Sequence, residues 1–279
     1  MEKSPEAIQG VVKARYTEVV EQYDDGNLDG STSLLKEQEL HALSRRVGYT
    51  EQDIEQMSEA GFGLGCGNPL ALQQIQRGDV VLDLGCGAGF DCFLAAEKTG
   101  VSGQVIGVDM TQAMIDKAKQ NAQVRKLHQV NFRVGQIEDL PVGDDSVNVI
   151  ISNCVINLSV DKQQVFNEAF RVLKPGGMLA ISDLALNMEL PDTVKNNEAL
   201  YSSCISGAIN KYAYIDLIAK AGFTDIVLES EVDAISLVPE DILPKLLEQF
   251  HLDDTEMAEI TPNMVVSVCL SAVKPNPEE

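Results

Sequence analysis

The chain is poor in the residues that many functional sites require. It has three histidines, no tryptophan, and 21 lysines and arginines against 43 aspartates and glutamates. The formal charge of −22 argues against a nucleic-acid partner, because phosphate recognition needs a basic surface. No apolar run is long enough to span a bilayer, and the opening residues lack an apolar signal segment. We therefore expect a cytoplasmic protein with a small-molecule substrate and no membrane partner.

Six cysteines are present, but they lack the spacing of a zinc site. There is no C-x-x-C pair and no cluster of cysteine with histidine. Thiols stay reduced in the cytosol, so no disulfide framework is expected. Cys86, Cys92 and Cys269 are interpreted as small core residues. The other three are Cys66 in a glycine-rich tract, Cys154 directly after an apolar run, and Cys204 in a connector.

The glycine-rich stretch from Asp83 to Gly89 (D-L-G-C-G-A-G) is the most informative motif. It follows the apolar run 80–82 and precedes a helical pattern that begins near Asp91. A strand ending in such a turn offers backbone N–H groups to a ligand, and glycines allow close approach. The dinucleotide pattern G-x-G-x-x-G is not met, because Phe90 stands at its last position. The spacing D-x-G-x-G-x-G instead resembles the first motif of class I S-adenosylmethionine (SAM) methyltransferases.

Further landmarks of that family follow in order. Residues 104–109 predict a strand ending at Asp109, whose carboxylate can accept both hydroxyls of a ribose. Strands are predicted at 130–134 and 147–152, and L-K-P-G-G at 173–177 precedes another at 178–182. The alternative is a fold of this class with no ligand at that edge. The resemblance implies SAM as cofactor, held by Asp83, Gly85, Cys86, Gly87, Gly89, Asp109, Met110, Ile137, Glu138 and Asn153.

The order of the elements indicates an α/β fold, with a Rossmann-like class I SAM methyltransferase sheet, a helical N-terminal lead-in and a C-terminal α+β extension. Residues 1–70 are the lead-in, with one helix capped by Ser4 and running to Tyr23, and another that starts at a Thr50–Asp53 capping box and ends near Ala60. Residues 71–183 are the SAM-binding core, with helices at 91–99, 112–126 and 161–172. Residues 184–273 form a substrate-side connector followed by elements at 215–221, 224–229, 239–250 and 264–273, and 274–279 is expected to be a disordered tail.

A second, narrower resemblance rests on short phrases around three of the cysteines. These are Gly65-Cys66-Gly67, S-N-C-V-I-N-L at 152–158, Asp161-Lys162, S-D-L at 182–184 and C-I-S-G-A at 204–208. Over residues 60–225 they resemble arsenite SAM-dependent methyltransferases, enzymes of EC class 2.1.1 that act in arsenic detoxification. The resemblance implies that Cys66, Cys154 and Cys204 are the catalytic residues and hold trivalent arsenic from arsenite or its glutathione conjugate. Soft arsenic suits thiolates, and its lone pair can attack a methyl group without a general base.

The chain departs from that family near its N-terminus. Relatives carry a phrase like S-T-S-x-C-C, whereas this chain has Ser31-Thr32-Ser33-Leu34-Leu35. Reduction of the arsenic product therefore depends on a thiol reductant, glutathione or thioredoxin, by a route that lacks this cysteine. Two alternatives stay open at this point. One is a SAM-dependent methyltransferase of a quinone-like or sterol-like metabolite, and the other is a non-catalytic thiol protein that binds metalloid.

Overall fold

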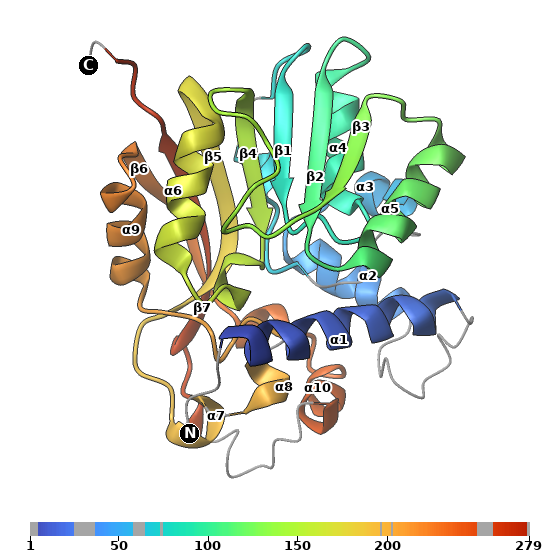
Figure 1. Ribbon diagram of the computed structural model, residues 1–279. Helices are drawn as coiled ribbons and strands as arrows, with labels where there is room; N and C mark the ends of the chain where they lie inside the picture. Colours follow the sequence, from blue (N-terminus) through green and yellow to red (C-terminus); the bar gives the residue numbers. More distant parts are fainter. Residues whose placement is uncertain are drawn as a thin grey trace.

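The computed structural model describes residues 5–24, 37–57, 65–72, 75–195, 197–201, 203–249 and 259–277. Within these ranges seven strands form one sheet of order β3-β2-β1-β4-β5-β7-β6 (Figure 1). Strands β1 to β5 run parallel, and β7 is antiparallel to both β5 and β6, which confirms the expected α/β sheet. The strands are β1 (Val80–Leu84), β2 (Gln104–Asp109), β3 (Val130–Val134), β4 (Val147–Asn153), β5 (Leu173–Leu186), β6 (Thr224–Asp233) and β7 (Val265–Val273).

Helices cover both faces of the sheet. Helices α4 (Phe90–Thr99) and α5 (Gln112–Arg125) lie on one face, and α6 (Lys162–Val172) and α9 (Lys211–Lys220) lie on the other (Figure 1). Successive strand residues point to opposite faces, so Val81 packs with Phe93 of α4 whereas Leu82 packs with Phe166 of α6. An apolar core therefore packs against each face of the sheet. The carboxyl edge of the sheet lies outside both cores, and this edge is where ligands bind in folds of this class.

Helix α1 (Pro5–Asp24) crosses the carboxyl edge of the sheet (Figure 1). It is followed by α2 (Glu37–Arg46), which the sequence analysis did not anticipate, and by α3 (Glu51–Met57). The predicted capping box is present, since the Thr50 backbone N–H donates to the Asp53 carboxylate (2.9 Å) and the Asp53 N–H donates to the Thr50 hydroxyl (3.1 Å). The Ser4 cap, the S-T-S-L-L phrase and the predicted end of the second helix near Ala60 lie outside the described residues.

The C-terminal half differs from expectation in several boundaries. Strand β5 begins at Leu173 rather than after L-K-P-G-G, because Leu173 already pairs with Val147 ahead of a bulge. Helix α9 begins before the predicted Ile215, because the Asn210 side chain accepts a hydrogen bond from the Tyr212 N–H and caps it. The remaining elements are α7 (Asp192–Lys195), α8 (Glu198–Tyr201), α10 (Leu243–Gln249) and the short 3-10 turns Pro69–Ala71, Ile156–Leu158 and Ile235–Leu237.

The prediction of a disordered tail at 274–279 is wrong for its first residue, Lys274. Lys274 is 9% exposed, and its backbone N–H donates to the Gly177 carbonyl (2.9 Å). Its ammonium group donates to the Asp145 carboxylate (2.6 Å) and to the carbonyls of Phe170 and Leu173 (2.7 Å each). These partners fix the end of β7 at the amino edge of the sheet. Among the described helices, none is both long and apolar enough to cross a membrane.

Candidate active site

The glycine turn after β1 needs its glycines for different reasons. Gly85, Gly87 and Gly89 all have positive φ (69°, 51° and 99°), which side chains disfavour. A β-carbon on Gly85 would stand 2.4 Å from Val155, and one on Gly89 would stand 2.7 Å from Phe93. A β-carbon on Gly87 would meet only the Met114 sulfur at 4.0 Å, so it would project into free space. Gly87 therefore leaves a cradle open for a ligand, while Gly85 and Gly89 permit close packing.

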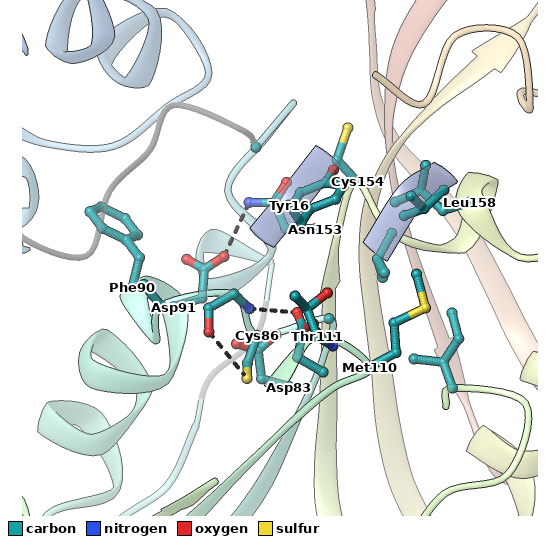
Figure 2. Close-up of a pocket in the computed structure, with 18 of the residues that line it drawn as sticks. Tyr16, Asp83, Cys86, Phe90, Asp91, Met110, Thr111, Asn153, Cys154 and Leu158 are labelled. Atoms are coloured by element: carbon teal, nitrogen blue, oxygen red, sulfur yellow. Dashed lines mark hydrogen bonds between the residues drawn. The ribbon is translucent and has the colours of Figure 1, made fainter. Parts of the chain in front are cut away.

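A pocket opens beside this turn, at the carboxyl edge of β1, β2 and β4 (Figure 2). Gly89 is not part of its wall, because it lies at the N-terminus of α4 against Phe93. Helix α1 closes the pocket from outside with Gln9, Val12 and Tyr16. The other predicted cofactor contacts all line it, and they are Asp83, Gly85, Cys86, Gly87, Asp109, Met110, Ile137, Glu138 and Asn153.

Carboxyl groups give this pocket an acidic character. Asp109 accepts hydrogen bonds from the backbone N–H groups of Gly87 (3.0 Å) and Thr111 (2.8 Å), and burial raises its pKa. Burial also raises the pKa of Asp91 to about 6, and burial together with the nearby Asp91 raises the pKa of Asp83. A ligand with positive charge would stabilise the ionised form of these buried carboxylates. SAM carries an ammonium and a sulfonium group, so the acidic pocket and the open cradle at Gly87 fit it.

Asn153, at the end of β4, connects the pocket to the loop that carries Cys66. Its amide oxygen accepts from the Cys66 backbone N–H (3.1 Å), and its amide nitrogen donates to the Gly67 carbonyl (2.9 Å). The same nitrogen lies 3.1 Å from the Asp91 carboxylate, as Figure 2 shows, and 2.9 Å from the Tyr49 hydroxyl. Asn153 therefore clamps the backbone of the Cys66 loop against the wall of the pocket.

The glycines on either side of Cys66 explain the phrase G-C-G. A β-carbon on Gly65 would stand 2.6 Å from the Asn153 amide nitrogen, and one on Gly67 would stand 2.7 Å from Ser182. The Ser267 hydroxyl also donates to the Cys66 carbonyl (2.6 Å). Only a backbone without flanking side chains can press this closely against β4, β5 and β7.

Cys66, Cys154 and Cys204 come together beside the pocket, although they lie far apart in the sequence. The sulfurs of Cys66 and Cys154 and a carboxylate oxygen of Asp183 lie within 4.8 Å of one another. The Cys204 thiol donates to the Cys154 carbonyl (2.7 Å). Cys154 itself lines the pocket (Figure 2). The structure therefore brings the three predicted residues close together, and their role as one site stays a prediction.

Two of the three thiols sit on strained backbone. Cys154 and Cys204 have φ values of 55° and 65°, in the left-handed region that residues other than glycine rarely occupy. Such conformations cost of order 1–3 kcal/mol and persist where the surrounding structure requires them. Here the reversal after β4 and the turn after α8 direct both side chains into one cluster.

The clustered thiols are protonated at neutral pH in the absence of a ligand. Burial raises the pKa of Cys66 to about 11, and the hydrogen bond to Cys154 together with burial raises the pKa of Cys204. The hydrogen bond with Cys204 lowers the pKa of Cys154, but the contact with Cys66 and burial outweigh it and raise the pKa overall. A thiophilic ligand must therefore displace protons when it binds.

Asp183 lies behind the thiols on β5 and was not expected to contribute to the site. Its carboxylate accepts from the Tyr214 hydroxyl (3.0 Å), the Asn157 amide (2.9 Å) and the Leu184 N–H (2.8 Å). Burial raises its pKa to about 6. The S-D-L phrase marked this position in the sequence, but nothing local to it indicates proximity to Cys66.

The part of the pocket wall that α1 supplies was not predicted from the sequence. Val12 is 1% exposed and packs with Cys154 and Cys204, and Tyr16 packs against the same cluster. Burial raises the pKa of Tyr16, and the nearby Cys204 and Cys154 raise it further. Helical periodicity places these residues on one face of α1, but it does not reveal what that face covers.

The other three cysteines do not belong to the group of Cys66, Cys154 and Cys204, although Cys269 is near enough to contribute to the raised pKa of Cys66. Cys86 and Cys92 are buried, and the Cys92 thiol donates to the Asp83 carboxylate (3.2 Å). Cys269 is half-buried on β7, with its sulfur 3.3 Å from the Ser182 hydroxyl. The interpretation of Cys86 and Cys92 as small buried residues is confirmed by their exposure.

Comparison with known proteins identifies the fold and the family. Residues 75–233 match a model of the methyltransferase domain. An arsenite methyltransferase from Halobacterium salinarum is 37% identical over 98% of this chain and 68% of its own length. A second arsenite methyltransferase, from Aquipseudomonas alcaligenes, is 41% identical over 65% of this chain, which spans 54% of that protein.

A solved structure agrees with these sequence matches. The crystal structure of an arsenic(III) S-adenosylmethionine methyltransferase from Chlamydomonas reinhardtii superposes with a TM-score of 0.60. It is 30% identical and covers 85% of this chain, which in turn covers 74% of that structure. Sheet order, pocket, clustered thiols and relatives agree, and the chain belongs to the arsenite methyltransferase family of class I SAM-dependent methyltransferases.

Proposed function

We propose that this chain transfers a methyl group from SAM to trivalent arsenic held by Cys66, Cys154 and Cys204. The observation that supports this most directly is the convergence of the three thiols next to a pocket that fits SAM. A methyltransferase for a quinone-like or sterol-like metabolite would have no use for three clustered thiols. A protein that only sequesters metalloid would have no use for the open cradle at Gly87.

Arsenite binding by the three thiols needs no dedicated base. Each of the three thiols loses its proton to one hydroxyl group of arsenite, so three sulfur–arsenic bonds form and three water molecules leave. This matches thiols that are protonated before the ligand arrives. Three thiolates then leave the lone pair of arsenic free, which makes arsenic the nucleophile.

The chain contributes position and exclusion of water rather than acid–base chemistry. SAM, when bound, supplies a methyl group on a positively charged sulfur. In the proposal Asp109 holds the ribose, Ile137 and Glu138 flank the adenine, and Cys154 holds arsenic at the wall of the pocket. Helix α1 covers both halves with Val12 and Tyr16, which keeps the nucleophile and the methyl group in a dry, fixed arrangement.

The proposal includes a thiol reductant as second partner. The methyl group moves without its bonding electrons, so the formal oxidation state of arsenic rises from three to five. Two electrons must return to form a trivalent product, and two thiols supply them by joining in a disulfide. Glutathione or a thioredoxin-type dithiol fits this role, and a cytoplasmic location keeps both the reductant and the cluster reduced.

Incubation of the reduced protein with SAM, arsenite and glutathione tests the proposal. We expect methylated arsenic species, separated by chromatography and measured by arsenic mass spectrometry, with release of S-adenosylhomocysteine. Release that is independent of arsenite, or SAM binding without any methylated arsenic, would contradict it. Cys269→Ser serves as a matched control, because its sulfur lies on β7 beside Ser182 rather than among the three thiols.

A further inference from the structure

The thiol cluster contains one more potential ligand than trivalent arsenic uses. An oxygen of Asp183 lies within 4.8 Å of the sulfurs of both Cys66 and Cys154. Trivalent arsenic with three thiolates carries its lone pair in the fourth direction, so it has no need of a carboxylate. Asp183 is 0% exposed, and burial of a carboxylate is costly unless it has partners or a function.

Asp183 is held as metal-binding carboxylates are held. The Tyr214 hydroxyl, the Asn157 amide and the Leu184 N–H donate to it at 2.8–3.0 Å. Hydrogen-bond donors of this kind orient a carboxylate ligand and fix its position. A carboxylate can accept about four hydrogen bonds, so three donors leave capacity for a further contact.

We propose that Cys66, Cys154, Cys204 and Asp183 form a tetrahedral site for Zn²⁺, which competes with trivalent arsenic for the same thiols. Zn²⁺ takes four ligands and accepts both thiolate and carboxylate. The proposal shares its cysteines with the proposed function, but it does not rest on arsenite being the substrate.

The required movements are small for three of the four ligands. Zinc–sulfur bonds of about 2.3 Å place two sulfurs of a tetrahedral site about 3.8 Å apart. Two sulfurs and one oxygen already lie within 4.8 Å of one another, so they need to approach by about an ångström. Cys204 must give up its hydrogen bond to the Cys154 carbonyl and turn its sulfur toward the other three ligands.

Zinc binding changes the charge of the site, because each of the three protonated thiols must release its proton to the solvent before it can act as a thiolate ligand. Three thiolates and a carboxylate carry four negative charges, of which Zn²⁺ neutralises two. The amine of half-buried Lys162 interacts electrostatically with Asp183 and Cys204, and it offsets part of the remaining negative charge. With trivalent arsenic the three thiolates are neutralised completely and Asp183 faces Lys162 alone. Asp183 therefore distinguishes the two occupants, because only zinc uses it as a ligand.

The test measures metal binding in the absence of SAM and arsenite. The full chain is reduced with a phosphine, which does not compete for metal, and Zn²⁺ affinity is measured against a chromophoric chelator. We expect Asp183→Asn to weaken Zn²⁺ binding by at least about tenfold, while affinity for phenylarsine oxide changes little. Glu168→Gln is the matched control, since Glu168 is also a buried carboxylate but lies on α6 with the Leu140 N–H and Arg171 as its partners, and the Zn²⁺ affinity of this variant should equal that of the wild type.

Equal Zn²⁺ affinity in the wild type and Asp183→Asn would overturn the proposal, as would unchanged affinity in Cys154→Ser. If Asp183→Asn does not fold, X-ray absorption of the zinc-loaded wild type decides the question. We expect three sulfur ligands and one oxygen ligand, and a site made of sulfur alone or mostly of oxygen and nitrogen overturns the assignment. Failure of arsenite methylation with an intact zinc site would contradict the proposed function and leave this inference standing.

Discussion

The two halves of the candidate site are built in different ways. The cofactor half comes largely from one stretch between Asp83 and Glu138, in which each contact follows a strand of the same sheet. The thiol half is gathered from a loop before the sheet, the end of β4 and the connector after β5. The first half depends on local turn geometry, whereas the second depends on the packing of distant segments. Substitutions in one half should therefore leave much of the other intact.

Cys154→Ser should have the largest effect on the thiol half while leaving the cofactor half intact. Cys154 lies at the end of a central strand and lines the pocket, so its loss removes the ligand nearest to the cofactor. We expect methylation of every arsenical to fall by more than about 100-fold, because arsenic is no longer aligned with the methyl group. SAM affinity, measured by calorimetry, should be unchanged. Substantial arsenite methylation by this variant would overturn the mechanism.

Cys66→Ser should show a loss that depends on the substrate. Cys66 supplies the third sulfur, which inorganic arsenite needs but which is not required once a methyl group occupies that coordination position. We expect activity on arsenite to fall about 10- to 100-fold and activity on methylarsonous acid to fall much less. Equal losses on the two substrates, compared by initial rates, would indicate that Cys66 has a role beyond ligation.

Asp109→Ala should weaken the cofactor half by about 2 kcal/mol, since it removes a carboxylate that accepts charge-assisted hydrogen bonds. The Gly87 and Thr111 N–H groups also lose their acceptor, so the turn becomes less ordered. Calorimetric titration with SAM measures the loss, and binding of phenylarsine oxide should be retained. Asp116→Ala on the exposed side of α5 is the control. An unchanged SAM affinity in Asp109→Ala would contradict the assignment of this pocket.

Asn153→Ala tests the contact between the two halves and has the smallest expected effect. It removes the hydrogen bonds to Cys66 and Gly67, and we expect arsenical affinity to fall by about 1–2 kcal/mol. Asn148→Ala is a matched control on the same strand, because Asn148 binds Val80 and Lys174 at the opposite edge. Both variants are compared with phenylarsine oxide in the presence of SAM. Equal losses of arsenical affinity in Asn153→Ala and Asn148→Ala would show that Asn153 contributes only to the stability of the fold.

The SAM-binding core could be predicted from the sequence because the patterns that indicate its strands and turns are local. Apolar runs that end at Asp83 and Asp109 identify strands, and the glycines between Gly85 and Gly89 mark the turn between β1 and α4. The capping box at Thr50 and Asp53 was found for the same reason, since both partners lie within one helical turn. The three thiols were identified only through a resemblance, because no local pattern connects Cys66 with Cys204.

What sequence reasoning missed depends on contacts between segments. Nothing in α1 reveals that Val12 and Tyr16 cover the thiols, since a buried face has the same periodicity whatever it packs against. Asp183 lies on the buried strand β5, but its neighbours Cys66 and Tyr214 come from a loop before the sheet and from α9. Helix α2 is short and rich in charged residues, and no element was predicted for it from the sequence.

The anchored end of β7 has a practical consequence for handling this protein. Lys274 holds the chain at the amino edge of the sheet, where it contacts Asp145, Phe170 and Leu173, and Asn153 and Cys154 lie at the opposite edge. A fluorescent label or a surface linker attached after Lys274 therefore leaves the molecule on the side away from α1 (Figure 1). Immobilisation through that end turns the side that carries α1 and the thiol cluster toward the solution, which suits the chain to an electrode or a chip that senses arsenic in water.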